Sequence, residues 1–155
     1  MIRIAVLSGK GGTGKTVFTS GLAYILERKK SFADCDVEAA NLSLVLNPGD
    51  TVSRPFYGLE KASINQDNCI SCGKCMEHCR FEAVEENDSI FHIDNISCEG
   101  CGVCETVCPA DAIVFSAFRD GEIYYSKTDQ GPLSHAELTP GSGTSGLLVH
   151  EVKKE

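Results

Sequence analysis

Eight of the nine cysteines fall into two copies of one pattern, in which three cysteines are separated by two residues and a fourth follows after three more. The two runs are Cys69, Cys72, Cys75 and Cys79, and Cys98, Cys101, Cys104 and Cys108. Three thiolates two residues apart on a tight loop can each reach an iron on one face of a cubane, and the fourth thiolate must come from elsewhere. The spacing therefore predicts two [4Fe–4S] clusters.

Zinc is the main competing metal for these cysteines. Zinc sites usually take their ligands as two separated Cys-x2-Cys pairs, whereas each run here has three cysteines in a row at that spacing. A disulfide scaffold is disfavoured because no export signal is visible and the cytosol keeps thiols reduced. Gly73 and Gly102 recur at the same place in each run, where a small residue lets backbone amides approach sulfur or simply satisfies a turn. The ninth cysteine, Cys35, is expected to pack as a small hydrophobic residue.

Residues 60–118 resemble bacterial ferredoxins that hold two clusters. In such ferredoxins the fourth cysteine of each run ligates the other cluster. The resemblance therefore implies one ligand set of Cys69, Cys72, Cys75 and Cys108, and a second of Cys98, Cys101, Cys104 and Cys79. Residues 81–84 and 110–114 resemble the short helix and strand that follow each run in these ferredoxins.

A second motif lies at the N-terminus. Residues 2–7 are short and mostly apolar, which suits a buried strand, and residues 8–16 contain the pattern G-x4-G-K-T. In such a phosphate loop, Lys15 reaches the β and γ phosphates of ATP and the Thr16 hydroxyl ligates Mg²⁺. Apolar residues at helical spacing follow, so we expect the loop to lie between a strand and a helix N-terminus. The residues expected to bind the nucleotide are Gly11, Gly12, Thr13, Gly14, Lys15 and Thr16.

The loop carries an additional lysine, Lys10. The string from Lys10 to Thr16 resembles the deviant Walker A motif of the MinD/ParA family of dimeric ATPases, which includes the nitrogenase iron protein and iron–sulfur carrier ATPases. The resemblance implies that Lys10 reaches the nucleotide of a partner subunit and stabilises charge on the transferring phosphoryl group. Residues 33–42 resemble the Asp-x-Asp segment of the family, which implies that Asp36 positions the attacking water or Mg²⁺. From local chemistry alone, Lys10 fits a surface lysine, and Asp34 and Asp36 fit turn residues.

The order of these motifs resembles that of MinD-superfamily ATPases with an inserted ferredoxin domain. The implied fold is an α/β P-loop partial domain with an inserted α+β bacterial-ferredoxin-like domain. We expect residues 1–55 to form the N-terminal part of the ATPase domain and residues 56–118 the cluster domain. Residues 119–155 are then a hairpin at Asp120-Gly121, a linker and the start of the returning ATPase segment, since Asp-Gly favours tight hairpin turns.

The chain departs from that family in two respects. The second expected strand is short, with only residues 31–33 between a basic run and Asp34. The family continues with an Asp-x-x-Pro-Gly motif and with strands that complete the sheet, and neither follows here. The two expected strands in residues 1–50 therefore lack neighbours for their apolar faces. We expect a fragment, a truncated reading frame, or half of a split protein. His135 has no companion ligand in the sequence and is interpreted as a surface or packing residue.

Composition excludes some classes of partner. The net charge of −8 disfavours nucleic acid, because phosphate binding needs clustered lysine and arginine. No apolar stretch approaches the roughly 18 residues of a membrane span, and Met1–Leu7 is too short for the apolar core of a secretory signal. We therefore expect a cytoplasmic protein without a membrane span.

Two functions remain open from the sequence. The first is an ATP-binding cluster protein in which nucleotide state is coupled to electron transfer or cluster delivery. The second is a simple ferredoxin-type electron carrier with a vestigial nucleotide site. ATP hydrolysis is expected for the full-length family and is expected to be weak or absent in this chain alone. The expected partners are a redox protein and either a second copy or a chain that supplies the missing ATPase half. No residue favours a third interpretation, a redox or metal sensor.

Overall fold

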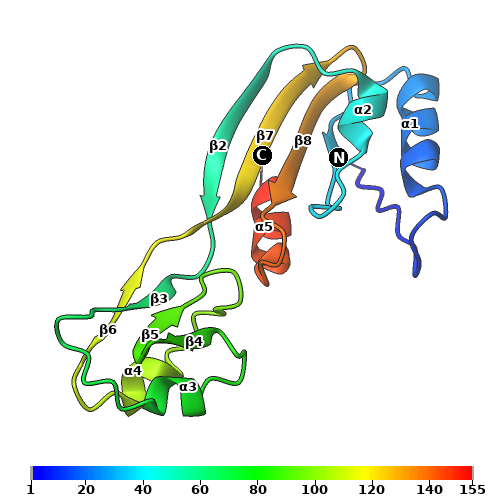
Figure 1. Ribbon diagram of the computed structural model, residues 1–155. Helices are drawn as coiled ribbons and strands as arrows, with labels where there is room; N and C mark the ends of the chain where they lie inside the picture. Colours follow the sequence, from blue (N-terminus) through cyan, green and yellow to red (C-terminus); the bar gives the residue numbers. More distant parts are fainter. Residues whose placement is uncertain (1, 155) are drawn as a thin grey trace. The chain divides into compact units, whose positions relative to one another are not determined.

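The computed structural model describes residues 2–154, with five helices and eight strands assigned in that part of the chain (Figure 1). The elements are α1 Lys15–Ile25, β1 Phe32–Ala33, α2 Leu42–Leu46, β2 Thr51–Tyr57, β3 Lys61–Ile64, α3 Lys74–Glu77, β4 Val84–Asn87, β5 Ile90–Ile93, α4 Val103–Val107, β6 Ile113–Ser116, β7 Arg119–Thr128, β8 Gly131–Leu138 and α5 Ser145–Val152. None of the described helices is long and apolar enough to cross a membrane.

The chain forms two compact units. The first unit combines the chain up to Arg54 with Glu122–Glu137 and the segment from Val149, and the second combines Pro55–Gly121 with Leu138–Leu148. Residues 119–155 are therefore divided between the two units rather than forming one tail. The predicted domain bounds stay a prediction, because compactness does not show which segments fold independently.

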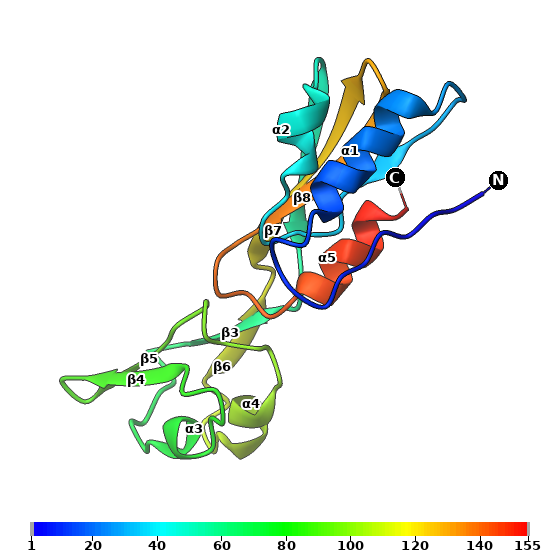
Figure 2. The ribbon, with the colours of Figure 1, turned by 90° about the vertical axis from the view of Figure 1, so that its right-hand side faces the viewer.

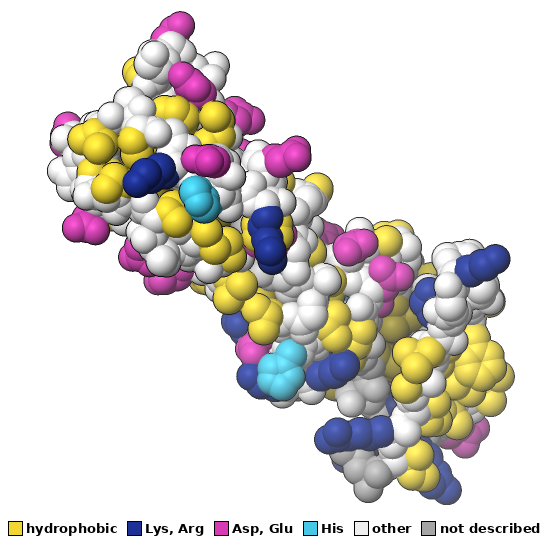
Figure 3. Space-filling view, turned by 90° about the horizontal axis from the view of Figure 1, so that it is seen from below, with side chains coloured by type: hydrophobic (Ala, Val, Ile, Leu, Met, Phe, Trp, Pro, Cys, Tyr) yellow, Lys and Arg dark blue, Asp and Glu magenta, His cyan; other side chains and the backbone are white. Residues whose placement is uncertain are grey.

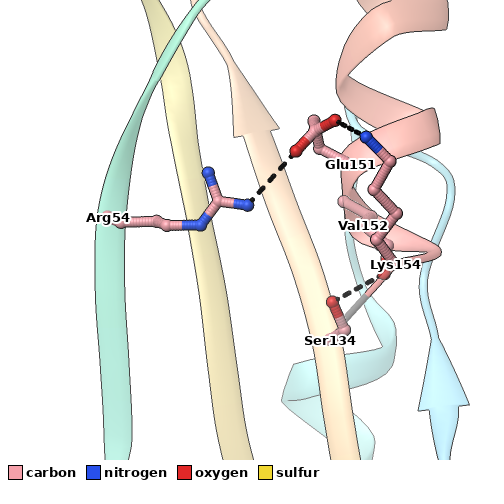
Figure 4. Close-up of polar contacts among 5 residues, drawn as sticks. All are labelled: Arg54, Ser134, Glu151, Val152 and Lys154. Carbon is pink, nitrogen blue, oxygen red and sulfur yellow. Dashed lines mark hydrogen bonds and ion pairs between the residues drawn. The ribbon is translucent and has the colours of Figure 1, made fainter.

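The first unit contains a four-stranded sheet in the order β1-β8-β7-β2, in which β1 runs parallel to β8. Its small core joins Ala23 of α1, Leu42 and Leu46 of α2, and Leu133 of β8. Helix α5 is tied to the sheet where the Ser134 hydroxyl donates a hydrogen bond to the Val152 carbonyl over 2.9 Å (Figure 4). The same view shows Glu151 between Arg54 and Lys154, at 3.5 and 2.6 Å.

The predicted strand at residues 2–7 is wrong. No strand is assigned there, and the side chains of Ile2, Ile4 and Leu7 are 84, 65 and 87% exposed. A strand needs backbone partners along its length, and β1 is only two residues long with one edge already paired to β8. Helix α1 forms directly after the loop, as predicted. Its larger apolar side chains Val17, Phe18 and Ile25 nonetheless remain exposed, although Ala23 is buried. The face of the molecule drawn in Figure 3 has hydrophobic side chains at many points of its surface.

The second unit repeats a strand, a cysteine run with a short helix, and a second strand. The first repeat supplies β3, α3 and β4, and the second supplies β5, α4 and β6. The strands are interleaved: β3 pairs antiparallel with β6, from Lys61↔Ser116 to Ile64↔Ile113, and β4 pairs antiparallel with β5. Helices α3 and α4 lie side by side (Figures 1 and 2). The expected strands after each run are present, but the short helices lie within the runs rather than after them.

The predicted hairpin at Asp120-Gly121 is wrong as well. Both residues lie inside the continuous strand β7, and the chain reverses between β7 and β8 instead. Asp120 is fully buried, its carboxylate accepts a hydrogen bond from the Thr144 hydroxyl over 3.1 Å, and its carbonyl accepts one from the Thr139 amide over 2.7 Å. These buried contacts outweigh the local preference of Asp-Gly for a tight turn.

Candidate metal centres

Two cavities of similar volume lie in the second unit, about 330 and 360 Å³ including the space open to solvent. The cysteines that line the first are Cys69, Cys72, Cys75 and Cys108. The cysteines that line the second are Cys79, Cys98, Cys101 and Cys104. Each cavity thus combines three cysteines of one run with the fourth of the other, which is the grouping that the resemblance to ferredoxins implies.

The interleaved strands explain this exchange. Because β3 of the first repeat pairs with β6 of the second, Cys108, which precedes β6, is brought to the cavity of the first run. Because β4 pairs with β5, Cys79 is brought in the same way to the cavity of the second run. The remaining lining is mostly apolar, and it includes Phe91 in the first cavity and Phe115 in the second.

Two glycines shape the cysteine loops. Gly73 and Gly102 immediately precede α3 and α4 in the left-handed conformation, with φ of 74° and 78°. A Cβ on Gly73 would be in ordinary contact with Phe91, at 3.6 Å, and one on Gly102 would meet nothing within 4 Å. The glycines are therefore required for their backbone conformation rather than for space, which favours the turn interpretation.

The sulfur atoms lie in partly buried surroundings. Burial raises the pKa of the Cys75 and Cys104 thiols, and the amides of Met76 and Glu105 oppose that rise. Cys108 Sγ accepts a hydrogen bond from the Ala112 amide over 3.3 Å. A bound metal centre favours the thiolate form of such cysteines and offsets the cost of burying it.

Each cavity is lined by four cysteines, which is the number of thiolates that a cubane takes. Among residues 2–154, no three His, Cys, Asp or Glu side chains converge in a way that would hold one metal ion. A zinc ion draws its cysteine sulfurs to about 2.3 Å from one point, whereas a cubane distributes its thiolates over separate irons. The cysteine sets therefore fit the cluster interpretation.

A buried lysine also supports the fit of these cysteines to an anionic cluster. Lys61 is 2% exposed, and its ammonium donates a hydrogen bond to the Cys98 carbonyl. A lysine is almost never fully buried without a counter-charge, and no carboxylate in the described residues forms an ion pair with this one. A cluster ligated by four thiolates is anionic and would supply that charge beside Cys98. Sequence reasoning missed Lys61, although a lysine beginning an otherwise uncharged strand was the available signal.

Residues 8–14 of the phosphate-loop motif form an exposed loop in the first unit, and Lys15 and Thr16 begin α1. Gly12 and Gly14 have φ of 73° and 88°, and α1 begins at Lys15 with no side chain capping its N-terminus. The Lys15 ammonium donates a hydrogen bond to the Ser8 hydroxyl over 3.2 Å, and the Ser8 and Thr13 hydroxyls both donate to the Lys10 carbonyl, over 2.9 and 3.3 Å. No side chain accepts a hydrogen bond from the amides at the start of α1, so no capping side chain competes with a ligand for these amides.

The Asp-Cys-Asp segment has mainly local contacts. The Asp34 carboxylate accepts a hydrogen bond from the Asp36 amide over 3.1 Å, which confirms its turn interpretation. It also accepts one from the Leu42 amide at the start of α2, over 3.0 Å. Asp36 is exposed, and its catalytic role stays a prediction. Cys35 is exposed, so the expectation that it packs as a small hydrophobic residue is wrong.

His135 is a packing residue, as predicted. It is 7% exposed and stacks on Tyr124, with the ring centroids 4.9 Å apart. Burial lowers the pKa of its imidazole, and the carboxylates of Asp34 and Glu137 oppose that shift.

Comparison with known proteins gives an independent view. Residues 62–115 match the family described as the 4Fe-4S dicluster domain. The uncharacterized proteins MJ0578 and MJ0579 of Methanocaldococcus jannaschii are 37 and 29% identical to the chain, over 99% of its length and over 54 and 56% of their own. A protein of Staphylococcus haemolyticus named "Putative formate dehydrogenase SH0748" is 32% identical over 57% of this chain and 10% of its own length. The chain spans about half the length of the two archaeal relatives.

The fold and the comparisons together define a class. The chain is a mixed α/β structure that contains a ferredoxin-like iron–sulfur domain. The matches support an iron–sulfur electron carrier. The dicluster match includes all eight paired cysteines and excludes the phosphate loop, so the P-loop and MinD/ParA resemblance stays a prediction.

Proposed function

We propose that the second unit holds two [4Fe–4S] clusters and relays single electrons between a donor and an acceptor protein. The ligands of the first cluster are Cys69, Cys72, Cys75 and Cys108, and those of the second are Cys98, Cys101, Cys104 and Cys79. The observation that carries the proposal is the pair of cavities, each lined by one of these crossed sets. Each cluster, when bound, takes up and releases one electron.

The residues around the sulfurs then have definable roles. Apolar side chains such as Phe91 and Ile113, which are 5 and 7% exposed, exclude water from the sulfurs and so influence the reduction potential. The Ala112 amide stabilises negative charge on Cys108 Sγ. The partial match to a protein named as a formate dehydrogenase is consistent with a relay module that supplies or drains electrons in a larger redox system.

Metal analysis of anaerobically purified protein tests this function. We expect about eight iron and eight sulfide per chain, with spin-coupled EPR signals after dithionite reduction. Cys108→Ser should perturb the first cluster and Cys79→Ser the second, whereas Cys35→Ser should leave the iron content unchanged. Zinc without sulfide would refute the electron-relay function, and perturbation of the cluster of its own run by Cys108→Ser would refute the crossed ligand sets.

The phosphate loop favours a second, coupled function. We propose that Gly11, Gly12, Thr13, Gly14, Lys15 and Thr16 bind Mg²⁺ and ATP in the cytoplasm, and that nucleotide state is linked to electron transfer or cluster carriage. The support is the uncapped N-terminus of α1 behind two left-handed glycines. In this proposal Lys10 acts on the nucleotide of a second copy and Asp36 acts on the attacking water, in a dimer or with a chain that completes the sheet.

Calorimetric titration of the iron-loaded protein with Mg²⁺ and ATP tests the coupled function. We expect measurable binding that Lys15→Ala abolishes and Lys10→Ala retains, with little or no hydrolysis by this chain alone. Absence of binding to the unmodified protein would refute the coupled function and leave the simple electron carrier.

A further inference from the structure

Lys61 is a buried positive charge beside a cluster ligand. It begins β3, pairs in register with Ser116 of β6, and is 2% exposed. Its ammonium donates a hydrogen bond to the carbonyl of Cys98, and Cys98 is itself 7% exposed and lines the second cavity. A charge held in such surroundings is weakly screened by solvent and acts strongly on neighbouring charges.

The two repeats differ at the position of this lysine. Lys61 lies eight residues before Cys69, and the residue eight before Cys98 in the second repeat is Ile90. Ile90 begins β5, pairs with Asn87, and is 46% exposed. One repeat therefore has a buried cation at a position where the other has an exposed apolar residue.

Each cavity lining also contains one charged side chain. Lys74 lines the first cavity and is exposed, and Glu99 lines the second and is half-buried. Solvent screens these two charges more than it screens Lys61, because screening increases with exposure. Lys61 is therefore the charge expected to act most strongly on its neighbouring cavity.

We propose that Lys61 raises the reduction potential of the second cluster, the one ligated by Cys98, Cys101, Cys104 and Cys79. This inference rests on the proposed electron-relay function. Reduction adds one electron from an external one-electron donor and makes the cluster more negative, and no proton is taken up. The fixed positive charge of Lys61 stabilises that reduced form, while its hydrogen bond holds the Cys98 backbone in place. Lys61 acts on the cluster through its charge, and its hydrogen bond positions the backbone of the ligand Cys98.

Potentiometric titration monitored by EPR, on the intact iron-loaded protein, tests the proposal. Lys61→Gln removes the charge but keeps an N–H donor for the Cys98 carbonyl. At a fixed applied potential, the ratio of reduced to oxidised second cluster should fall about tenfold, which is 59 mV for a one-electron couple. The ratio for the first cluster should change less than about twofold. The matched control, Lys74→Gln, removes an exposed lysine and should change either ratio less than about twofold.

The outcomes separate this proposal from the function on which it rests. The Cys101→Ser and Cys72→Ser proteins, each altered among the first three cysteines of one run, assign the EPR signals to the second and first clusters. An equal shift of both clusters, or no shift in Lys61→Gln, overturns the role of Lys61 while iron and sulfide content still supports the electron relay. Loss of the second cluster from Lys61→Gln also overturns it, because Lys61 then retains the cluster rather than tuning it. An unmodified protein without iron and sulfide refutes the relay itself.

Discussion

Replacing Gly58 by alanine should destabilise the second unit through a lack of space. An added Cβ would lie 2.0 Å from Asp120 Oδ2 and 2.7 Å from Thr144 Cγ2. Both neighbours are buried, Asp120 at 0% and Thr144 at 4% exposure, so neither can swing into solvent without disturbing the packing. Relief of the clash requires the Asp120 carboxylate to move away from the Thr144 hydroxyl, which donates to it.

The expected cost follows from these two effects. Overpacking of a tight site costs about 1–3 kcal/mol, and loss of a buried hydrogen bond to a carboxylate costs about 1.5–3 kcal/mol. Because part of each cost is relieved by the same movement, we expect about 3 kcal/mol in total. For a unit of this size, that corresponds to a fall in melting temperature of more than about 10 °C.

Gly146→Ala is the matched control. Gly146 lies in α5, and an added Cβ there would meet nothing within 4 Å. Alanine should be neutral or stabilising by up to about 1 kcal/mol, since glycine is the poorer helix former. Thermal melting of the iron-loaded proteins, followed by far-UV circular dichroism, measures both effects. A melting temperature for Gly58→Ala within about 2 °C of the parent protein would refute the steric argument.

Three further predictions concern Gly100, His135 and Glu151. Gly100→Ala should reduce retention of the second cluster more than Gly102→Ala does. Both glycines have positive φ, but of the two only Gly100 would place an added Cβ 2.4 Å from a backbone carbonyl oxygen. Iron content after gel filtration measures the retention, and equal retention by the two variants would contradict the prediction. Burial lowers the pKa of His135 below the ordinary 6.5, so the unfolded chain takes up the proton first and the free energy of unfolding should fall as the pH drops below about 6.5. In His135→Phe the slope of melting temperature against pH should become flatter. An unchanged slope would show that another group causes the pH dependence. Glu151→Gln should change the melting temperature less than about 2 °C, because the ion pairs of Glu151 with Arg54 and Lys154 are partly exposed to solvent. A larger loss would show that these pairs anchor α5.

The cluster site was the most predictable part of the molecule. Cysteine spacing along a loop is a local property, and it directly limits which thiolates can reach one metal centre. The crossed partners, Cys108 and Cys79, came from resemblance to ferredoxins, and the strand pairing now gives them a physical cause. The role of Lys10 needs a partner subunit and that of Asp36 needs a bound nucleotide, so both stay predictions.

The features that sequence reasoning missed depend on long-range contacts. Residues 2–7 have the composition of a buried strand, but a strand forms only where a neighbour offers backbone groups along its length. Asp120-Gly121 has the composition of a turn, but contacts with Thr139 and Thr144 hold it in a strand. From the sequence Lys61 resembles an ordinary surface lysine. Its burial depends on the hydrogen bond that its ammonium donates to the Cys98 carbonyl, 37 residues away.

The two units differ in how completely they bury their own apolar residues. In the second unit every cysteine-bearing loop is flanked by paired strands, and Ala62, Ala83, Cys98 and Ile113 form a core from within that unit. In the first unit Val17, Phe18 and Ile25 of α1 are 75, 57 and 76% exposed. The cluster cavities are therefore lined by contacts that this chain already makes, whereas the expected nucleotide loop lies beside apolar side chains that the described residues leave exposed. For this reason electron relay is the function that the chain supports best. ATP-linked coupling is the function that depends more on a partner that covers this apolar surface.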